Sequence, residues 1–178
     1  MFENIDKVYW IVYYFRKGGD LMENTLNVAK CLYETYLELF KHPMDEMKMH
    51  KLMYFVQRES LMFNKKELFD EPFLGWKYGP VLASVRGEYL KGTMFSTVSG
   101  TVSEETKRLV NSVLKRYGTV SSWKLSSLSH NEFSWKCARK GLASFENGNV
   151  KLTVNAMKVD AARELAERKS NFVETRWG

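Results

Sequence analysis

The sequence has few of the residues that punctuate or cross-link a chain. Its 178 residues include three prolines and two cysteines, Cys31 and Cys137. Two cysteines are too few for a disulfide framework or a four-cysteine zinc site, and so few prolines argue against many short strands joined by tight turns. No apolar run approaches the ~18 residues that cross a bilayer, and no cleavage site follows the aromatic stretch near the N-terminus. We therefore expect a soluble, mostly helical, cytoplasmic protein without a membrane segment.

Motifs that carry catalysis are also missing. The sequence has no zinc-protease histidine spacing, no phosphate-binding glycine loop and no nucleophile elbow. Cys137 has cationic neighbours that could lower the pKa of its thiol, but His130 is the one base nearby in sequence. We therefore predict a protein that is not an enzyme and that has no cofactor and no metal site.

The positive charge is concentrated in the second part of the chain. Residues 1–100 hold 13 basic and 13 acidic residues, whereas residues 101–178 hold 14 and 8, so the whole net charge of +6 lies there. A basic segment of this kind favours binding to an acidic protein partner or to a nucleic acid. The alternative is a solvated, lysine-rich helical surface, which the lack of any run of five basic residues favours.

Helical periodicity dominates the chain between residues 24 and 169. We expect helices over 24–41, from Asp45 onward, and over 81–90, 103–117, 132–141 and 158–169, with a short one from residue 121. The helix after Asp45 is apolar around most of its circumference, so it should be central, with Lys48 and Lys51 on its outer face. Residues 93–102 are predicted to be a loop or a weak strand, and the alternating pattern of residues 150–154 predicts a possible strand. The expected fold is mainly α, a single compact domain with at most a minor β element.

Three ranges describe the expected domain organisation. Residues 22–170 should form the helical domain, 1–21 an N-terminal extension and 171–178 a C-terminal tail. The extension has two explanations that the sequence leaves open. It is either an additional amphipathic helix or a stretch upstream of a start at Met22.

An aromatic segment interrupts the helices at residues 67–80. It contains Phe69, Phe73, Trp76 and Tyr78 between prolines and glycines that exclude a regular helix, and Pro80 should open the next one. Because large aromatic surface is favourable to bury, this segment must fold back on the domain or meet a partner. For Trp76 we favour the first role, with the indole covering the helix at 49–56; the alternative is an interface anchor.

A second candidate surface lies in residues 121–141. Two short helices around a turn have the length of a helix-turn-helix, which would place Lys136, Arg139 and Lys140 on one face. DNA binding through this basic patch is therefore an alternative function, although two-helix corners are common in any helical domain.

Three motifs, in order, resemble one family. MHKLMYFVQ at residues 49–57 resembles its pattern L-Q-K-L-x-Y-[FY]-x-Q, and FDEPFLGWKYGPV at 69–81 resembles F-x-E-x-[FI]-x-A-W-x-x-G-P-V. LSSLSH at 125–130 and WKCA at 135–138 resemble L-x-x-L-[ST]-H…P-W-x-x-A. Together they are similar to the Panacea antitoxin domain, a family that includes SocA-like proteolytic adaptors and proteins of mobile genetic elements such as prophages.

The resemblance implies a helical domain that neutralises a cognate toxin or other target protein by direct stoichiometric contact. It implies no catalysis; some members deliver the toxin to a protease, and a mobile-element effector could instead bind a host defence protein. Residues within the motif segments are the candidate signature and interaction residues: Lys51, Tyr54, Gln57, Trp76, Tyr78, Gly79, Pro80, Val81, His130 and Trp135.

Overall fold

The computed structural model describes residues 22–177, and these are mainly helical, as expected. The N-terminal extension predicted at 1–21 lies outside the described residues. The elements in chain order are α2 (Thr25–Phe40), α3 (Glu46–Phe63), β1 (Leu74–Trp76), β2 (Gly79–Val81), α4 (Ala83–Lys91), α5 (Glu104–Tyr117), α6 (Ser122–His130), α7 (Phe133–Ala138) and α8 (Val154–Trp177). Within 22–177 no helix combines the length and the hydropathy that a membrane span requires.

Polar side chains define where four of the helices begin. Asn24, Asp45, Ser103 and Ser121 have extended backbone angles, and their side chains accept hydrogen bonds from backbone N–H groups two or three residues ahead. These bonds satisfy donors that the first helical turn leaves without partners. The starts predicted at Asp45 and Ser103 are confirmed, as is the short helix after residue 121.

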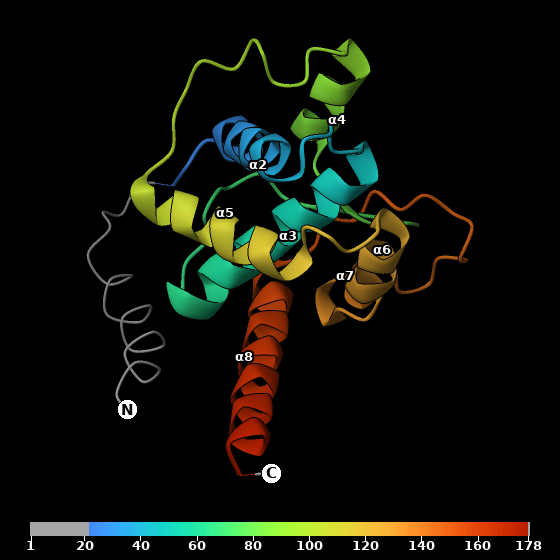
Figure 1. The fold of residues 1–178 in the computed structure, drawn as a ribbon. Coiled ribbons are helices and arrows are strands. Elements are labelled where there is room, and N and C mark those ends of the chain that lie inside the picture. Colours follow the sequence, from blue (N-terminus) through green and yellow to red (C-terminus); the bar gives the residue numbers. More distant parts are fainter. Residues whose placement is uncertain (1–21, 178) are drawn as a thin grey trace, which may run out of the picture.

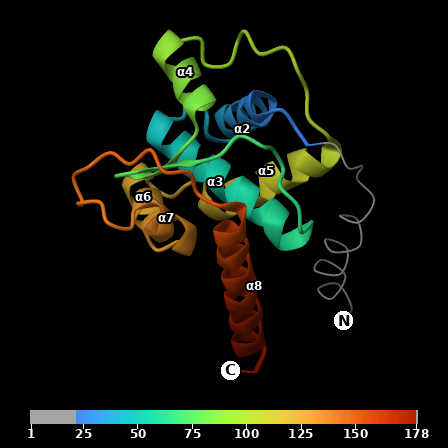
Figure 2. The ribbon, with the colours of Figure 1, turned by 180° about the vertical axis from the view of Figure 1, so that it is seen from behind.

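Helix α3 is the centre of the fold. Helices α2, α5, α6 and α8 and strand β2 all pack against it, and every residue from Lys48 to Met62 is buried. Figures 1 and 2 show α3 enclosed by the other elements, while α8 leaves this body and extends away from it. The central position predicted from its apolar residues is confirmed.

The same enclosure overturns the prediction for two of its lysines. Lys48 and Lys51 are only 7% and 1% exposed, not on an outer face. The Lys48 ammonium donates to the carbonyl of Gly118, which ends α5, at 3.0 Å. A helix C-terminus offers carbonyls without helical partners and a partial negative charge, so it stabilises a buried cation.

The aromatic segment folds into a small antiparallel hairpin rather than a loop. Leu74 pairs with Val81, Gly75 with Pro80, and Trp76 with Gly79. Pro80 therefore lies in β2 and not in the first turn of a helix, because α4 begins at Ala83. This element agrees with the expectation of at most a minor β component.

The last helix and the segment before it also differ from expectation. Helix α8 begins at Val154 and continues to Trp177, so it is longer than the predicted 158–169 and includes most of the predicted tail. The candidate strand at 150–154 is reduced to one bridge between Lys151 and Leu74. Residues 93–102 form turns and irregular structure.

Candidate interaction site around the β-hairpin

A two-residue turn, Lys77-Tyr78, closes the hairpin. Gly79 follows with φ +104°, a conformation that favours glycine. A Cβ at this position would lie 2.4 Å from the Ser129 hydroxyl and 2.6 Å from Lys51 Cε. Glycine is therefore required both by the backbone angle and by the close approach of α6 and α3.

Side chains from three helices hold the hairpin by its carbonyl groups, and we call these donors the hairpin seat. A hairpin of three-residue strands has few hydrogen bonds of its own, and its remaining buried carbonyls need partners. The seat consists of four contacts: Arg139 Nη1 to Gly75 O at 3.1 Å, Trp135 Nε1 to Trp76 O at 2.9 Å, Ser126 Oγ to Tyr78 O at 2.9 Å, and Lys51 Nζ to Pro80 O at 3.1 Å.

Lys51 is the most deeply buried member of the seat. Burial lowers the pKa of its ammonium to about 7, although the carboxylates of Glu46 and Asp45 oppose this shift. Near neutral pH the side chain therefore exchanges between a charged and an uncharged form, and both can donate to Pro80 O. The motif lysine thus contacts the motif proline directly.

His130 packs against Trp135 of the seat. Their rings stack with centroids 4.1 Å apart and planes 14° from parallel. Burial, with the cations of Lys51 and Arg139 adding to it, lowers the pKa of His130. A neutral imidazole stacks without the cost of desolvating a charge, so the ring orients the indole that donates to Trp76 O.

Two polar residues of α3 fix the chain on either side of the hairpin. The Gln57 side chain accepts from Leu68 N at 2.8 Å and donates to Phe69 O at 2.9 Å. His50 Nδ1 accepts from Leu82 N at 3.3 Å, directly after β2. The motif helix therefore holds the segment before the hairpin, the hairpin itself and the residue after it.

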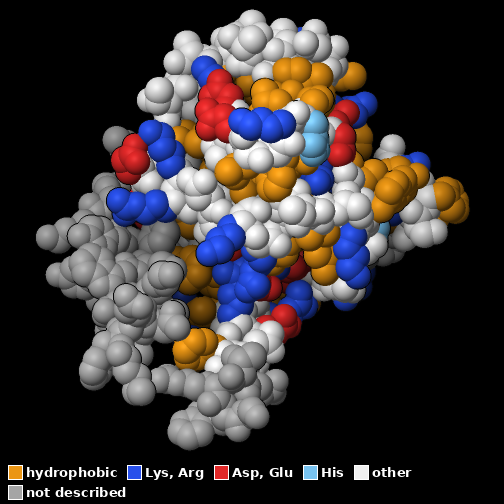
Figure 3. Space-filling view, in the orientation of Figure 1, with side chains coloured by type: hydrophobic (Ala, Val, Ile, Leu, Met, Phe, Trp, Pro, Cys, Tyr) orange, Lys and Arg blue, Asp and Glu red, His pale blue; other side chains and the backbone are white. Residues whose placement is uncertain are grey.

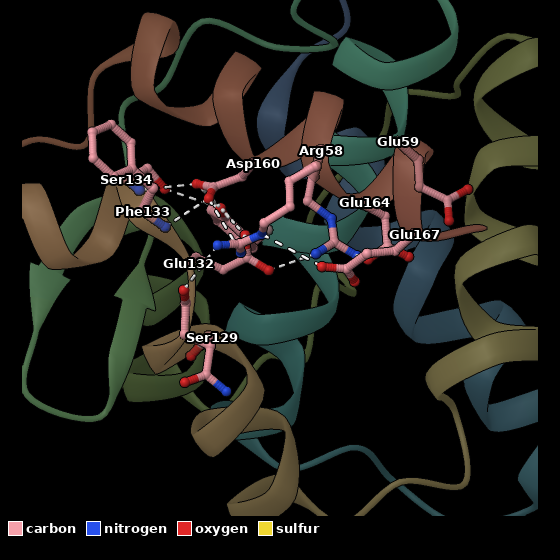
Figure 4. A network of polar contacts seen from close by, with 12 residues as sticks. Arg58, Glu59, Ser129, Glu132, Phe133, Ser134, Asp160, Glu164 and Glu167 are labelled. Atoms are coloured by element: carbon pink, nitrogen blue, oxygen red, sulfur yellow. Dashed lines mark hydrogen bonds and ion pairs between the residues drawn. The ribbon is translucent and has the colours of Figure 1, made fainter. Parts of the chain in front are cut away.

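Tyr54 belongs to a separate polar network, which Figure 4 shows between α3, α7 and α8. Its hydroxyl lies 3.0 Å from Asp160 Oδ2 and 3.0 Å from Ser134 Oγ. The Asp160 carboxylate also accepts from the backbone N–H groups of Phe133 and Ser134, at 2.6 and 2.9 Å. A residue of α8 therefore caps the N-terminus of α7, the helix that carries Trp135.

Ion pairs extend this network along α8. The Arg58 guanidinium is 3% exposed and contacts the carboxylates of Glu132 and Glu164. Arg168 pairs with Glu164 and with the fully buried Glu59. Burial raises the pKa of Glu132 to about 7, because desolvation and Asp160 outweigh the arginines beside it.

The hairpin presents an aromatic tip to solvent. Tyr78 is 46% exposed and Trp123, from the first turn of α6, is 65% exposed. Their ring centroids are 5.6 Å apart in an edge-to-face arrangement, and Lys77 Nζ lies 4.9 Å from the centre of the Tyr78 ring. We define Tyr78 and Trp123 as the aromatic tip.

The candidate residues from the motif segments differ in exposure. Tyr78 is the exposed one among them. Trp76, His130 and Trp135 are partly exposed, and the buried ones are Lys51, Tyr54, Gln57, Gly79, Pro80 and Val81.

Trp76 combines features of both roles considered for it. Its side chain is partly exposed, and with Met47, His50 and Lys51 it lines a hollow over the first turns of α3. The guanidinium of Arg86 covers one face of the indole, 5.1 Å from the ring centre. The indole therefore faces a hollow beside the first turns of α3, packs under Arg86 and still presents surface to solvent, and its role in the core or at an interface stays a prediction.

The predicted basic patch is not one exposed face. Lys136 and Lys140 are exposed, but Arg139 is 7% exposed, and its guanidinium donates to the carbonyls of Gly75, Ala143 and Glu146. Its position at the end of α7 turns it toward the hairpin. A DNA contact through all three cations would require Arg139 to leave the carbonyl of Gly75. DNA binding through this patch therefore lacks the middle one of its three cations.

Other cations gather elsewhere on the surface. Figure 3 shows Lys and Arg side chains where α5 meets α8, with acidic side chains among them. Arg116 lies 3.9 Å from Glu164, and Arg163 pairs with Glu132 at 3.2 Å. Arg116 and Arg163 are therefore matched by carboxylates that other elements supply. Among residues 22–177 no group of His, Cys, Asp or Glu side chains is arranged to hold a metal ion.

Trp123 was not a candidate from the sequence. It lies outside the apolar spacing of Leu125 and Leu128, and such a bulky aromatic residue off the buried stripe was the available signal. Its role depends on Tyr78, which is 45 positions earlier in the chain.

The comparisons with known proteins agree with the motifs. Residues 49–136, about half of the chain, match the family model described as antitoxin SocA-like, Panacea domain. These residues belong to the SocA-like Panacea family. The matched segment begins in α3, contains the complete hairpin and ends in α7, so the Panacea domain includes the aromatic tip and three of the four seat donors. No curated protein and no solved structure matches the chain.

Proposed function

We propose that this protein is a cytoplasmic antitoxin that binds a toxin, or another target protein, in a stoichiometric complex and performs no catalysis. The observation that supports this is an exposed aromatic pair held on a fixed hairpin inside the Panacea domain. Tyrosine and tryptophan dominate the residues that contribute most to protein interfaces. A rigid backbone beneath them lowers the conformational entropy that binding would otherwise cost.

Co-expression tests this proposal. The gene adjacent to the one encoding this protein is expressed alone and together with it, and growth and co-purification are measured. We expect toxicity of the neighbour alone, rescue by this protein, and a complex of fixed stoichiometry. A harmless neighbour together with the absence of any co-purifying protein would contradict the proposal.

Surface variants locate the contact. Tyr78→Ala combined with Trp123→Ala should abolish rescue and co-purification, because the change removes both exposed rings. Phe145→Ala is the matched control, since Phe145 is 77% exposed but lies outside the matched segment. Equal rescue by the double variant and the control would rule out the aromatic tip as the contact.

Toxin abundance separates direct inhibition from delivery to a protease. A stoichiometric inhibitor restores growth while the toxin level stays constant. An adaptor lowers the toxin level, and that fall stops when the cellular protease is inactivated. We propose direct inhibition, because the seat holds the aromatic tip in place as a preset binding surface; protease-dependent loss of the toxin would support the adaptor role instead.

A further inference from the structure

A small hollow opens beside the hairpin, next to the aromatic tip. Its volume is about 210 Å³, and it is lined by Glu46, Met47, His50, Lys51, Trp76, Lys77, Tyr78, Val81 and Arg86. Sites for small-molecule ligands usually measure ~300–1,000 Å³, whereas an apolar cavity of ~150 Å³ holds a benzene ring. The hollow therefore has the size for one apolar side chain and is small for a free metabolite.

The surface inside the hollow comes mainly from apolar groups. His50 and Lys51 are 2% and 1% exposed; His50 Nδ1 accepts from Leu82 N, Lys51 Nζ donates to Pro80 O, and His50 Nε2 is buried on the side of Glu46. The indole nitrogen of Trp76 is also buried away from solvent. Met47, the Trp76 ring and Tyr78 are the apolar or aromatic lining residues that reach solvent, and they favour an apolar occupant.

The rim of the hollow carries a positive excess. Of its charged residues that reach solvent, Lys77 and Arg86 are cations and Glu46 is the single carboxylate. Glu46 already pairs with Arg86 at 2.8 Å and lies 3.5 Å from His50 Nε2. A carboxylate from a partner would therefore meet Lys77 without displacing an existing pair.

We propose that this hollow is an anchor pocket that receives one apolar side chain from a partner segment with acidic residues beside it. This inference rests on the proposed function only in taking the partner to be a protein. In a symmetric contact a second copy of this chain would bring the same cationic rim, and the chain as a whole carries a net charge of +6. Charge complementarity therefore favours a different, acidic protein.

Binding of short peptides tests the pocket without knowledge of the toxin. The probes are the capped tripeptides Asp-Phe-Asp, Lys-Phe-Lys and Asp-Ser-Asp, titrated to millimolar concentrations against the full chain labelled with ¹⁵N. The indole N–H signal of Trp76, assigned with Trp76→Phe, reports occupancy of the hollow. We expect a saturable shift with Asp-Phe-Asp, affinity about tenfold weaker for Lys-Phe-Lys, and no shift with Asp-Ser-Asp.

A filling variant and a matched control complete the test. Met47→Trp places a large ring in the hollow and should abolish the shift, whereas Leu90→Trp adds the same ring on an exposed part of α4, where Leu90 is 71% exposed, and should preserve it. Equal binding of the acidic and basic peptides, binding of Asp-Ser-Asp, or no binding of any peptide would overturn the pocket.

The two proposals fail in different ways. Saturable binding of Asp-Phe-Asp together with a harmless neighbouring gene and no co-purifying protein would leave the pocket intact and overturn the antitoxin function. Rescue that depends on Tyr78 and Trp123 but is unaffected by Met47→Trp would leave the function intact and overturn the pocket.

Discussion

Two buried polar assemblies meet on α3, and they differ in what their donors hold. In the hairpin seat, side chains of α3, α6 and α7 donate to backbone carbonyls. In the network around Arg58, side chains pair with other charged side chains from α7 and α8. Donors to backbone fix the path of a short segment, whereas charged pairs fix how whole helices sit against each other. The seat therefore holds the hairpin that carries Tyr78, and the ion pairs orient α8 against α3.

Breaking the charged assembly should have the largest effect on stability. Arg58→Met leaves the carboxylates of Glu132 and Glu164 without their buried partner, so the free energy of unfolding should fall by about 3–5 kcal/mol in urea titrations. Arg86→Met removes a partly exposed arginine from its pair with Glu46 and should cost less than about 1 kcal/mol. Equal losses in the two variants would contradict the distinction between buried and exposed pairs.

A substitution in the hairpin should cause the second-largest loss in the free energy of unfolding. In Gly79→Ala the alanine must adopt a positive φ, and its methyl group lies against Ser129 and Lys51. We therefore expect the free energy of unfolding to fall by about 2–3 kcal/mol. Gly92→Ala is the control, because Gly92 also has a positive φ but has open space around it. Thermal and urea unfolding of both variants measure the contribution of close packing, and no excess loss in Gly79→Ala would show that the seat is loose.

The pH dependence of stability sharpens the comparison further. The pKa of Lys51 is about 7 in the folded protein and ordinary, near 10.5, in the unfolded chain. Between these values the unfolded chain binds the extra proton, so stability rises with pH by up to about 1.4 kcal/mol per pH unit. Urea unfolding at pH 7, 8 and 9 should show this slope reduced in Lys51→Met and retained in Lys124→Met, which changes an exposed lysine. Parallel slopes for wild type and Lys51→Met would contradict the assignment.

The smallest effect on stability is expected at the aromatic tip itself. Tyr78→Ala and Trp123→Ala remove exposed rings that hold no part of the backbone, so each should change the free energy of unfolding by no more than about 0.5 kcal/mol. Calorimetry checks this for each variant. A loss above 2 kcal/mol would show that the tip is part of the core and would weaken its assignment as a binding surface.

Local chemistry made the helices predictable from sequence, and distant contacts made the site less so. Asp45 and Ser103 predict the starts of their helices because an N-cap side chain bonds a backbone N–H only three residues ahead. The three-residue strands were too short for a periodic signal. Pro80 suggested a helix start because proline suits the first turn of a helix, whereas its place in β2 and its contact with Lys51 exist only in the folded chain. Arg139 has helical spacing to Lys136, but its guanidinium donates to the nearby carbonyls of Ala143 and Glu146 and to that of Gly75, which is distant in the sequence.

The motif residues were found, but what they do could not be read from them. Lys51 and Trp135 bind main-chain oxygens of the hairpin, and main-chain atoms have no signature in a sequence. Trp123 was missed because its neighbour Tyr78 comes from another element. In physical terms, spacing reveals which face of a helix is buried, while the identity of the buried partner is a property of the tertiary fold.

The cap that Asp160 places on α7 has a consequence for the order of events during synthesis. Tyr78 leaves the ribosome about 80 residues before Asp160, a delay of roughly 4–16 s at ~5–20 residues per second. Until α8 arrives, the six-residue helix α7 lacks the acceptor for its first N–H groups, and Trp135 has no fixed position from which to hold Trp76 O. The nascent chain therefore contains Tyr78 and Trp123 well before the contact between Trp135 and Trp76 O can be fixed, so the hairpin is fully held only after α8 has been synthesised.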